Sequence, residues 1–292
     1  MILSDFVLLS RRNQVWSESG IDSRQRSPDK KYFDAYPYTV EYRYNSRGFR
    51  DAEWPISIDE LKNSIWCFGD SFTAGIGSPI DHTWVSILQK QTGIRCINVS
   101  MDGASNEWIA RKINRVLEEI NPQWIVVQWS YLHRTESSHT ELPDEDRRLF
   151  ALPDISLDNQ LNNFRNIRAS ISNTTTVIVE SCIPNCVMPH YSPFKIKDKI
   201  NQIKGSDWPD VINMSYDEGI AIDKTISDEL KNFKIYKELV EYFKYKDLFL
   251  AVDLENLEVK QIDFARDQHH YDHLTAGRFV DSIIGRFTTS SS

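Results

Sequence analysis

The sequence predicts an α/β fold, a three-layer αβα sandwich in which helices cover a parallel β-sheet, and two features of its apolar residues carry that prediction. From residue 64 onward, short apolar runs typical of strands alternate with longer runs that have helical spacing. The run 124–129 is apolar at five of its six positions, which is typical of a strand buried on both faces. In such a fold the carboxyl ends of the strands, and any site, lie at one edge of the sheet.

The expected elements follow from this spacing and from residues that start or stop helices. Strands are expected over 64–68, 94–99, 124–129 and 175–182. Helices are expected over 84–88 (closing near Gly93), 105–120, 157–171, 222–245 and 274–284. Ser105 is suited to cap the second of these helices, and Pro122 stops it.

The first sixty residues differ from the rest of the chain. The stretch 32–44 is rich in Tyr, Phe and Val, which predicts short strands, and 45–48 supplies turn residues. We therefore expect a β-rich extension over 1–60 and one α/β domain over 61–292. Four prolines interrupt the strand–helix alternation between 184 and 220, which predicts an insertion in that domain.

Composition and charge limit the classes of protein to which the chain can belong. Its 292 residues include 42 acidic and 34 basic side chains, and the net charge of −8 argues against nucleic acid as a partner. No apolar run reaches the ~20 residues that span a bilayer, and no basic leader opens the sequence, so we expect a cytoplasmic protein without a membrane span. Four cysteines are too few for a disulfide scaffold. The sequence carries no signal for an oligomeric state.

The first chemical signal is the motif Gly-Asp-Ser-Phe-Thr-Ala-Gly at 69–75, which directly follows the first expected strand. Its serine, Ser71, is expected at the edge of the sheet where the chain turns, and main-chain N–H groups that converge there can hold a developing oxyanion. The alternative interpretation is structural, with Asp70 or Ser71 capping a short helix.

The second signal is the segment Asp-Gln-His-His-Tyr-Asp-His at 267–273, just before the last expected helix. A serine hydroxyl is a weak nucleophile unless a base takes its proton, and a histidine oriented by a carboxylate is well suited to that task. Asp267 precedes His270 by three residues, so the two can pair within one loop. The alternative is a metal-binding or merely solvated histidine cluster.

The third signal is the segment 98–106, which follows the second expected strand. Gly103 in this segment can present an unobstructed N–H at the same sheet edge as Ser71. The alternative interpretation is an ordinary turn between a strand and a helix.

Together these three motifs resemble those of the SGNH hydrolase superfamily, also called GDSL-like esterases and lipases, over about residues 62–287. The resemblance implies a flavodoxin-like sheet and a hydrolase that needs no metal or organic cofactor. It also implies that Ser71 is the nucleophile, that Asp267 and His270 complete a triad, and that the N–H groups of Ser71 and Gly103 are oxyanion donors. His273 is the alternative base; His270 is preferred because Asp267 lies three residues before it and Asp272 then falls at the cap of the closing helix.

One departure from the family pattern concerns the oxyanion hole. The third block of the family supplies an asparagine, whereas 128–134 reads Gln-Trp-Ser-Tyr-Leu-His-Arg. Losing one oxyanion donor costs on the order of 10²–10³ in rate, so a substitute donor is needed. Ser130, or Asn106 from the second block, is the candidate for that role. Asp70, His133 and Arg134 are candidates for binding a polar or anionic substrate group, the alternative for His133 and Arg134 being a solvated loop.

The expected activity is that of a serine esterase that removes a small acyl group, acetyl in the first instance, from a polar or carbohydrate substrate. The stretch 40–51 is similar to a lead-in of some bacterial and phage members of the family, some of which act in polysaccharide acylation or deacylation. Two alternatives remain: an acyltransferase onto a glycan hydroxyl, and a catalytically degenerate carbohydrate-binding or viral structural module.

Overall fold

The computed structural model describes residues 3–4, 6–18, 38–132, 134–136, 148–149, 157–172, 175–184, 186, 257–267 and 270–287. The helix expected over 222–245, the insertion expected over 184–220 apart from its first residues, and His133 lie outside the described residues.

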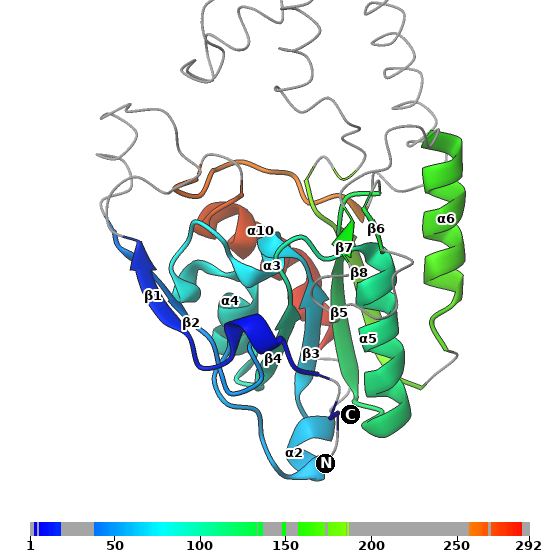
Figure 1. Cartoon of the computed structure of the whole chain (residues 1–292), viewed down its shortest axis with the longest axis horizontal. Helices are drawn as coiled ribbons and strands as arrows, with labels where there is room; N and C mark the ends of the chain where they lie inside the picture. The colour runs from blue at the N-terminus through cyan, green and yellow to red at the C-terminus, as the bar shows by residue number, and fades with distance from the viewer. Residues whose placement is uncertain are drawn as a thin grey trace, which may run out of the picture.

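A four-stranded parallel sheet forms the centre of the molecule (Figure 1). Its order is β4 (Cys96–Ser100), β3 (Ile65–Gly69), β5 (Trp124–Trp129) and β8 (Val177–Cys182). The four expected strands are thereby confirmed, each with ends within two residues of the expected ones. Within this sheet β3, the first of the four strands along the chain, lies between β4 and β5, which is the flavodoxin-like order.

Helices cover the sheet from both sides and complete the three layers (Figure 1). On one side, α4 (Trp84–Thr92) and α10 (His273–Ile283) contact each other, with the rings of Trp84 and Phe279 edge to face. On the other side, α5 (Asn106–Glu119) and α6 (Leu157–Ala169) pack together, and Phe164 of α6 meets Trp129 of β5. The three-layer αβα prediction is confirmed.

The predicted helix boundaries follow the capping chemistry. Ser105 is the N-cap of α5, and its hydroxyl accepts a hydrogen bond from the N–H of Trp108 at 3.1 Å. Helix α4 begins after Thr83, which caps it in the same way, and ends at Gly93. The boundaries predicted at Ser105 and Gly93 are confirmed, and α5 ends at Glu119, before Pro122.

The N-terminal segment packs on the α/β domain through two groups of apolar residues. Its strands β1 (Val15–Glu18) and β2 (Val40–Arg43) pair antiparallel, and α2 (Ile58–Lys62) precedes β3. Phe6, Phe49 and Trp54 join the main core, where the ring of Trp54 meets Trp66 of β3. A second cluster joins β2 to the loop after β3; its members are Val40, Tyr42, Tyr44, Ala74 and Ile76. Sequence spacing predicted neither β1 nor α2.

Short elements complete the described structure. They are the 3₁₀ helices η1 (Leu9–Arg11), η2 (Ile80–His82) and η7 (Ile284–Arg286), the single-turn helix α3 (Ser71–Ala74), and the paired strands β6 (Thr135–Glu136) and β7 (Arg148–Leu149). None of the helices in the described ranges is long and apolar enough to cross a membrane. All four cysteines are buried free thiols.

Candidate active site

Strand β3 passes into α3 at the carboxyl edge of the sheet (Figure 1). Ser71 lies at this junction. The strand ends at Gly69, and Asp70 is the N-cap of α3, with its Oδ1 accepting the N–H of Phe72 at 3.0 Å. The capping role that the sequence left as an alternative is therefore filled by Asp70. Ser71 is the first residue of the helix, and its hydroxyl is left to interact with other parts of the chain.

The Ser71 hydroxyl meets the imidazole of His270, which lies 199 positions later in the chain. The distance between Ser71 Oγ and His270 Nε2 is 2.8 Å, which is a hydrogen bond. The other ring nitrogen, Nδ1, pairs with Asp267 Oδ2, while Asp267 Oδ1 accepts the main-chain N–H of His270 at 3.0 Å. The structure thus brings Ser71, His270 and Asp267 into one hydrogen-bonded series of nucleophile, base and orienting carboxylate.

All three groups are shielded from water. The side chains of His270 and Asp267 are 2% and 1% exposed, and Ser71 is also buried. The ring of Phe72 packs against the imidazole of His270, with 4.5 Å between the ring centres and the two planes tilted by 59°. In such surroundings, hydrogen bonds and charge interactions are stronger than in water.

The loop that carries Asp267 and His270 is held against the loop that follows Ser71. The N–H of Arg266 donates to the carbonyl of Gly77 at 3.2 Å, and the N–H of Ala265 donates to the carbonyl of His270 at 2.6 Å. The first of these bonds joins the two loops and the second closes the loop that carries the imidazole, so the approach of His270 to Ser71 does not depend on side chains alone.

The alternative base, His273, lies in a different environment. Its side chain is 52% exposed, and Nδ1 is 3.6 Å from Asp272 Oδ2. Its ring packs against that of His82, with 4.8 Å between the ring centres. The structure brings His270 to Ser71 and places His273 with Asp272 and His82.

Asp70 and Arg134 form a buried ion pair beside the nucleophile. Asp70 Oδ2 accepts hydrogen bonds from Arg134 Nη1 at 2.8 Å and from the hydroxyl of Ser130 at 2.6 Å. Arg134 also lies over the ring of Tyr131. Asp70 is fully buried, and the positive charge of Arg134 balances its negative charge. The ion pair therefore forms part of the buried structure beside Ser71.

The candidate oxyanion donors are main-chain N–H groups, such as that of Gly103, and the side chains of Asn106 and Ser130. Gly103 follows β4 at the edge of the sheet that carries Ser71, and the N–H of Met101 in the same turn donates to the carbonyl of Gly69. The side-chain amide of Asn106, in contrast, donates to the carbonyls of Ser130 and Tyr131, and its oxygen accepts the N–H of Ser130 at 2.8 Å. The hydroxyl of Ser130 is held by Asp70.

Two buried tyrosines, Tyr131 and Tyr271, pack against Phe72, the residue after the nucleophile. Burial raises the pKa of Tyr271, whose hydroxyl donates to Gln128 Oε1 at 2.9 Å. Burial also raises the pKa of Tyr131, and the negative charge of Asp70 raises it further. Both hydroxyls therefore stay uncharged at neutral pH.

Arg50 is a residue of the site region that sequence spacing did not single out. Its guanidinium is buried and donates to the carbonyls of Glu41, Ala74 and Ser78 at 2.9 Å and to that of Gly75. It therefore closes the turn that follows α3. The lead-in stretch 40–51 contained the residue, but local spacing gave no indication that a cation would be needed there.

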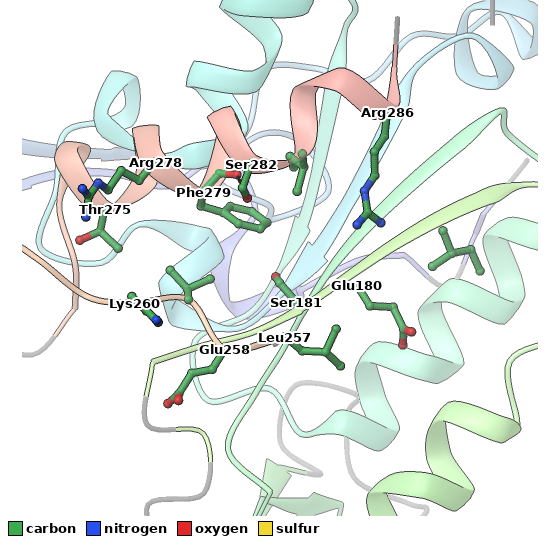
Figure 2. A pocket seen from close by; sticks show the side chains of 13 residues that line it. Glu180, Ser181, Leu257, Glu258, Lys260, Thr275, Arg278, Phe279, Ser282 and Arg286 are labelled. Atoms are coloured by element: carbon green, nitrogen blue, oxygen red, sulfur yellow. Dashed lines mark hydrogen bonds between the residues drawn. The ribbon is translucent and has the colours of Figure 1, made fainter. Parts of the chain in front are cut away.

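A separate pocket of about 720 Å³ opens on the β8 side of the sheet (Figure 2). Its walls come from β8, from residues 257–260 and from α10 with η7, and they carry charges of both signs, including Glu180, Glu258, Arg278 and Arg286. None of the triad residues lines it. The chemistry of the triad is therefore not directed into this pocket.

Comparisons with known proteins gave structural similarity only. No protein-family model and no curated protein sequence matches the chain. Among solved structures, TesA is 13% identical over 77% of this chain and 98% of its own, with a TM-score of 0.36. A member of the lipolytic protein G-D-S-L family from Veillonella parvula is 17% identical over 77% and 98%, with a TM-score of 0.33. The psychrotrophic esterase EstA from Pseudoalteromonas is 17% identical over 65% and 99%, with a TM-score of 0.30. Identities of 13–17% and TM-scores of 0.30–0.36 are too low to carry an activity over to this chain, so its chemistry is derived from its own residues.

Proposed function

We propose that the protein is a serine hydrolase that cleaves carboxylic esters. The observation that carries the proposal is the hydrogen-bonded series from Asp267 through His270 to Ser71, with 2.8 Å between the imidazole and the hydroxyl. This arrangement supplies a nucleophile, a base within reach of its proton, and a carboxylate that fixes the tautomer of the base.

In the proposed mechanism, His270 Nε2 takes the proton of Ser71 as its oxygen attacks the ester carbonyl. Asp267 holds Nδ1–H of His270 and stabilises the imidazolium that forms. The tetrahedral intermediate collapses to an acyl-enzyme on Ser71 when His270 returns the proton to the leaving alcohol. Water, activated by the same imidazole, then releases the acid and restores the serine.

The main-chain N–H groups of Ser71 and Gly103 are the proposed oxyanion donors. Of the side chains that the sequence offered for this role, Asn106 donates to two main-chain carbonyls and Ser130 donates to Asp70. In this arrangement neither directs a hydrogen at a substrate. The proposed enzyme therefore relies on main-chain donors, and its rate is expected to be lower than that of an enzyme with one more donor.

The proposed substrate is an ester of a small acyl group, acetyl in the first instance, on a polar or carbohydrate scaffold. The similarity of the stretch 40–51 to the lead-in of polysaccharide-modifying members of the SGNH superfamily supports this choice. The structure adds that residues of this stretch, Tyr42 and Arg50, contact the loop after Ser71. The lead-in is therefore close enough to the nucleophile to influence what binds there.

Transfer of the acyl group to a glycan hydroxyl is the second candidate, because the same acyl-enzyme serves both reactions. A product assay with an acetyl donor and a glycan separates them, since a transferase forms an acetylated glycan and a hydrolase forms free acetate. A catalytically degenerate binding module is the third candidate: the missing third-block asparagine favours it, whereas the hydrogen-bonded series of Ser71, His270 and Asp267 disfavours it.

Turnover of p-nitrophenyl acetate tests the proposal. We expect hydrolysis by the wild type and its loss in Ser71→Ala, because without the hydroxyl no acyl-enzyme forms. The control is Ser282→Ala, which removes an exposed serine hydroxyl on α10 that donates to the carbonyl of Phe279 in the same helix. Equal turnover by the Ser71→Ala variant would rule out the mechanism.

A further inference from the structure

His82, Asp272 and His273 meet at the surface beside the N-terminus of α10. His82 comes from η2 and lies 190 positions before Asp272. His82 Nδ1 is 2.8 Å from Asp272 Oδ1, and His273 Nδ1 is 3.6 Å from Asp272 Oδ2. Each of the three side chains offers one ligand atom, and these atoms all lie within 4.8 Å of one another.

The carboxylate of Asp272 is not used for capping, although the residue occupies the N-cap position of α10. Asp263 accepts the N–H groups at the start of the helix instead, from Leu274 at 2.8 Å and from Thr275 at 3.0 Å. The carboxylate of Asp272 therefore interacts with other groups, among them the imidazole of His82 at 2.8 Å and that of His273 at 3.6 Å.

Hydroxyl groups hold the Asp272 carboxylate in place. Tyr38 donates to Oδ2 at 2.8 Å and Ser78 donates to Oδ1 at 3.0 Å. Metal-binding carboxylates are commonly oriented by such outer hydrogen bonds. The two imidazoles differ from the buried carboxylate in being open to solvent, with His82 at 27% and His273 at 52% side-chain exposure. An ion can therefore reach the cluster from solution.

The spacing of the cluster suits a small transition-metal ion. Tetrahedral Zn²⁺, with bonds of about 2.0–2.1 Å, holds neighbouring ligand atoms roughly 3.3 Å apart. His82 Nδ1 lies 2.8 Å from Oδ1 of Asp272 and His273 Nδ1 lies 3.6 Å from Oδ2, so each imidazole nitrogen is close to that spacing from one of the two carboxylate oxygens. Small rotations of the side chains of His82 and His273 would bring both nitrogens to it.

We propose that His82, Asp272 and His273 form a binding site for a divalent transition-metal ion, Zn²⁺ being the ion that their two imidazoles and one carboxylate suit. The remaining positions of the ion face solvent and take water. The bound ion joins η2 to the start of α10, two residues after His270, and so fastens the loop that carries the proposed base. The site does not depend on the proposed ester hydrolysis.

Calorimetric titration of the full chain with Zn²⁺ tests the site. We expect one strong Zn²⁺ per chain, and an affinity at least about tenfold weaker in His82→Ala and in His273→Ala. The exposure of His273 makes its replacement compatible with folding. The control is Asp281→Asn, which changes an exposed acid on the same helix outside the cluster and should bind Zn²⁺ like the wild type.

Thermal unfolding gives a second readout that does not involve catalysis. Because a ligand that binds only the folded state stabilises it, Zn²⁺ should raise the Tm of the wild type and of Asp281→Asn, and raise it less in the double variant His82→Ala/His273→Ala. Absence of saturable Zn²⁺ binding by the wild type, or equal affinity in the two histidine variants, would overturn the proposal and leave a hydrogen-bonded Asp–His pair.

Discussion

A Cβ atom on Gly77 would lie 2.9 Å from Cγ of Asp267, so the loop after Ser71 passes directly against the carboxylate of the triad. Gly77 also has a φ of +82°, in the left-handed region that glycine adopts readily. Replacing Gly77 by alanine must therefore displace the Asp267 side chain. We expect Gly77→Ala to lower kcat for p-nitrophenyl acetate by on the order of 10²-fold, since even a 1 Å misplacement of catalytic groups has that effect.

Gly93→Ala is the matched control for this prediction. Gly93 has a φ of +70°, but a Cβ atom there would have no neighbour within 4 Å. The variant carries the backbone strain of about 1–2 kcal/mol without any contact with the site. Both variants should lose stability in urea unfolding, and only Gly77→Ala should lose activity. Equal kcat values in the two variants would contradict the positioning role of Gly77.

Asp267→Asn tests the orienting carboxylate. The amide keeps an oxygen that can accept the main-chain N–H of His270, but it cannot stabilise an imidazolium and does not fix the required tautomer. We expect kcat to fall on the order of 10³–10⁴-fold, with a much smaller change in KM. Steady-state kinetics with p-nitrophenyl acetate measures both. A variant with near-normal kcat would show that His270 acts without this partner.

Arg50→Met tests the turn that follows the nucleophile. The substitution leaves the carbonyls of Glu41, Ala74 and Ser78 without their charged donor in a buried place. We expect a loss of about 3 kcal/mol or more in the free energy of unfolding, measured with urea. Arg43→Met on β2 is the control, because Arg43 is an exposed arginine whose ion pair among the described residues is with Glu41, and it should lose less than about 1 kcal/mol.

Asp51 makes the stability of the fold depend on pH. Burial raises its pKa to about 6, although Arg95 and the N–H of Asn98 act against that rise. Because the folded state then holds a proton that the unfolded state releases at lower pH, the contribution of Asp51 is greatest below about pH 4 and declines as pH rises to about 6.

Urea unfolding of the wild type and Asp51→Asn between pH 4 and pH 7 measures this contribution. The wild type should lose on the order of 2 kcal/mol relative to the variant over that interval. Parallel stability curves would show that Asp51 is ionised throughout, with the positive charge of Arg95 outweighing burial.

The sheet and its helices were predictable because local patterns determine them. Apolar runs gave all four strands, and the capping residues Ser105 and Gly93 gave helix ends. Ser71, Asp267 and His270 could be selected as candidates because the carboxyl ends of parallel strands share one edge, and because their spacing resembles a known family.

Partners supplied from distant parts of the chain could not be predicted in this way. Nothing in the spacing of Asp70 indicates that Arg134 neutralises it, or that Ser130 donates its hydroxyl to the same oxygen. Asp272 was expected to cap α10, and it occupies that position, but Asp263 supplies the hydrogen bonds. Choices between such partners depend on tertiary packing, which brings together side chains that are far apart in sequence.

Labelling of Ser71 by a fluorophosphonate, located by peptide mass spectrometry, tests the central claim most directly. A serine whose proton is taken by His270 reacts with this probe, whereas an ordinary buried serine does not. The account predicts a single modification on Ser71 in the wild type and its loss, or a large decrease in its rate, in His270→Ala. A wild type left unlabelled at Ser71, or a His270→Ala variant labelled as fast as the wild type, would contradict it.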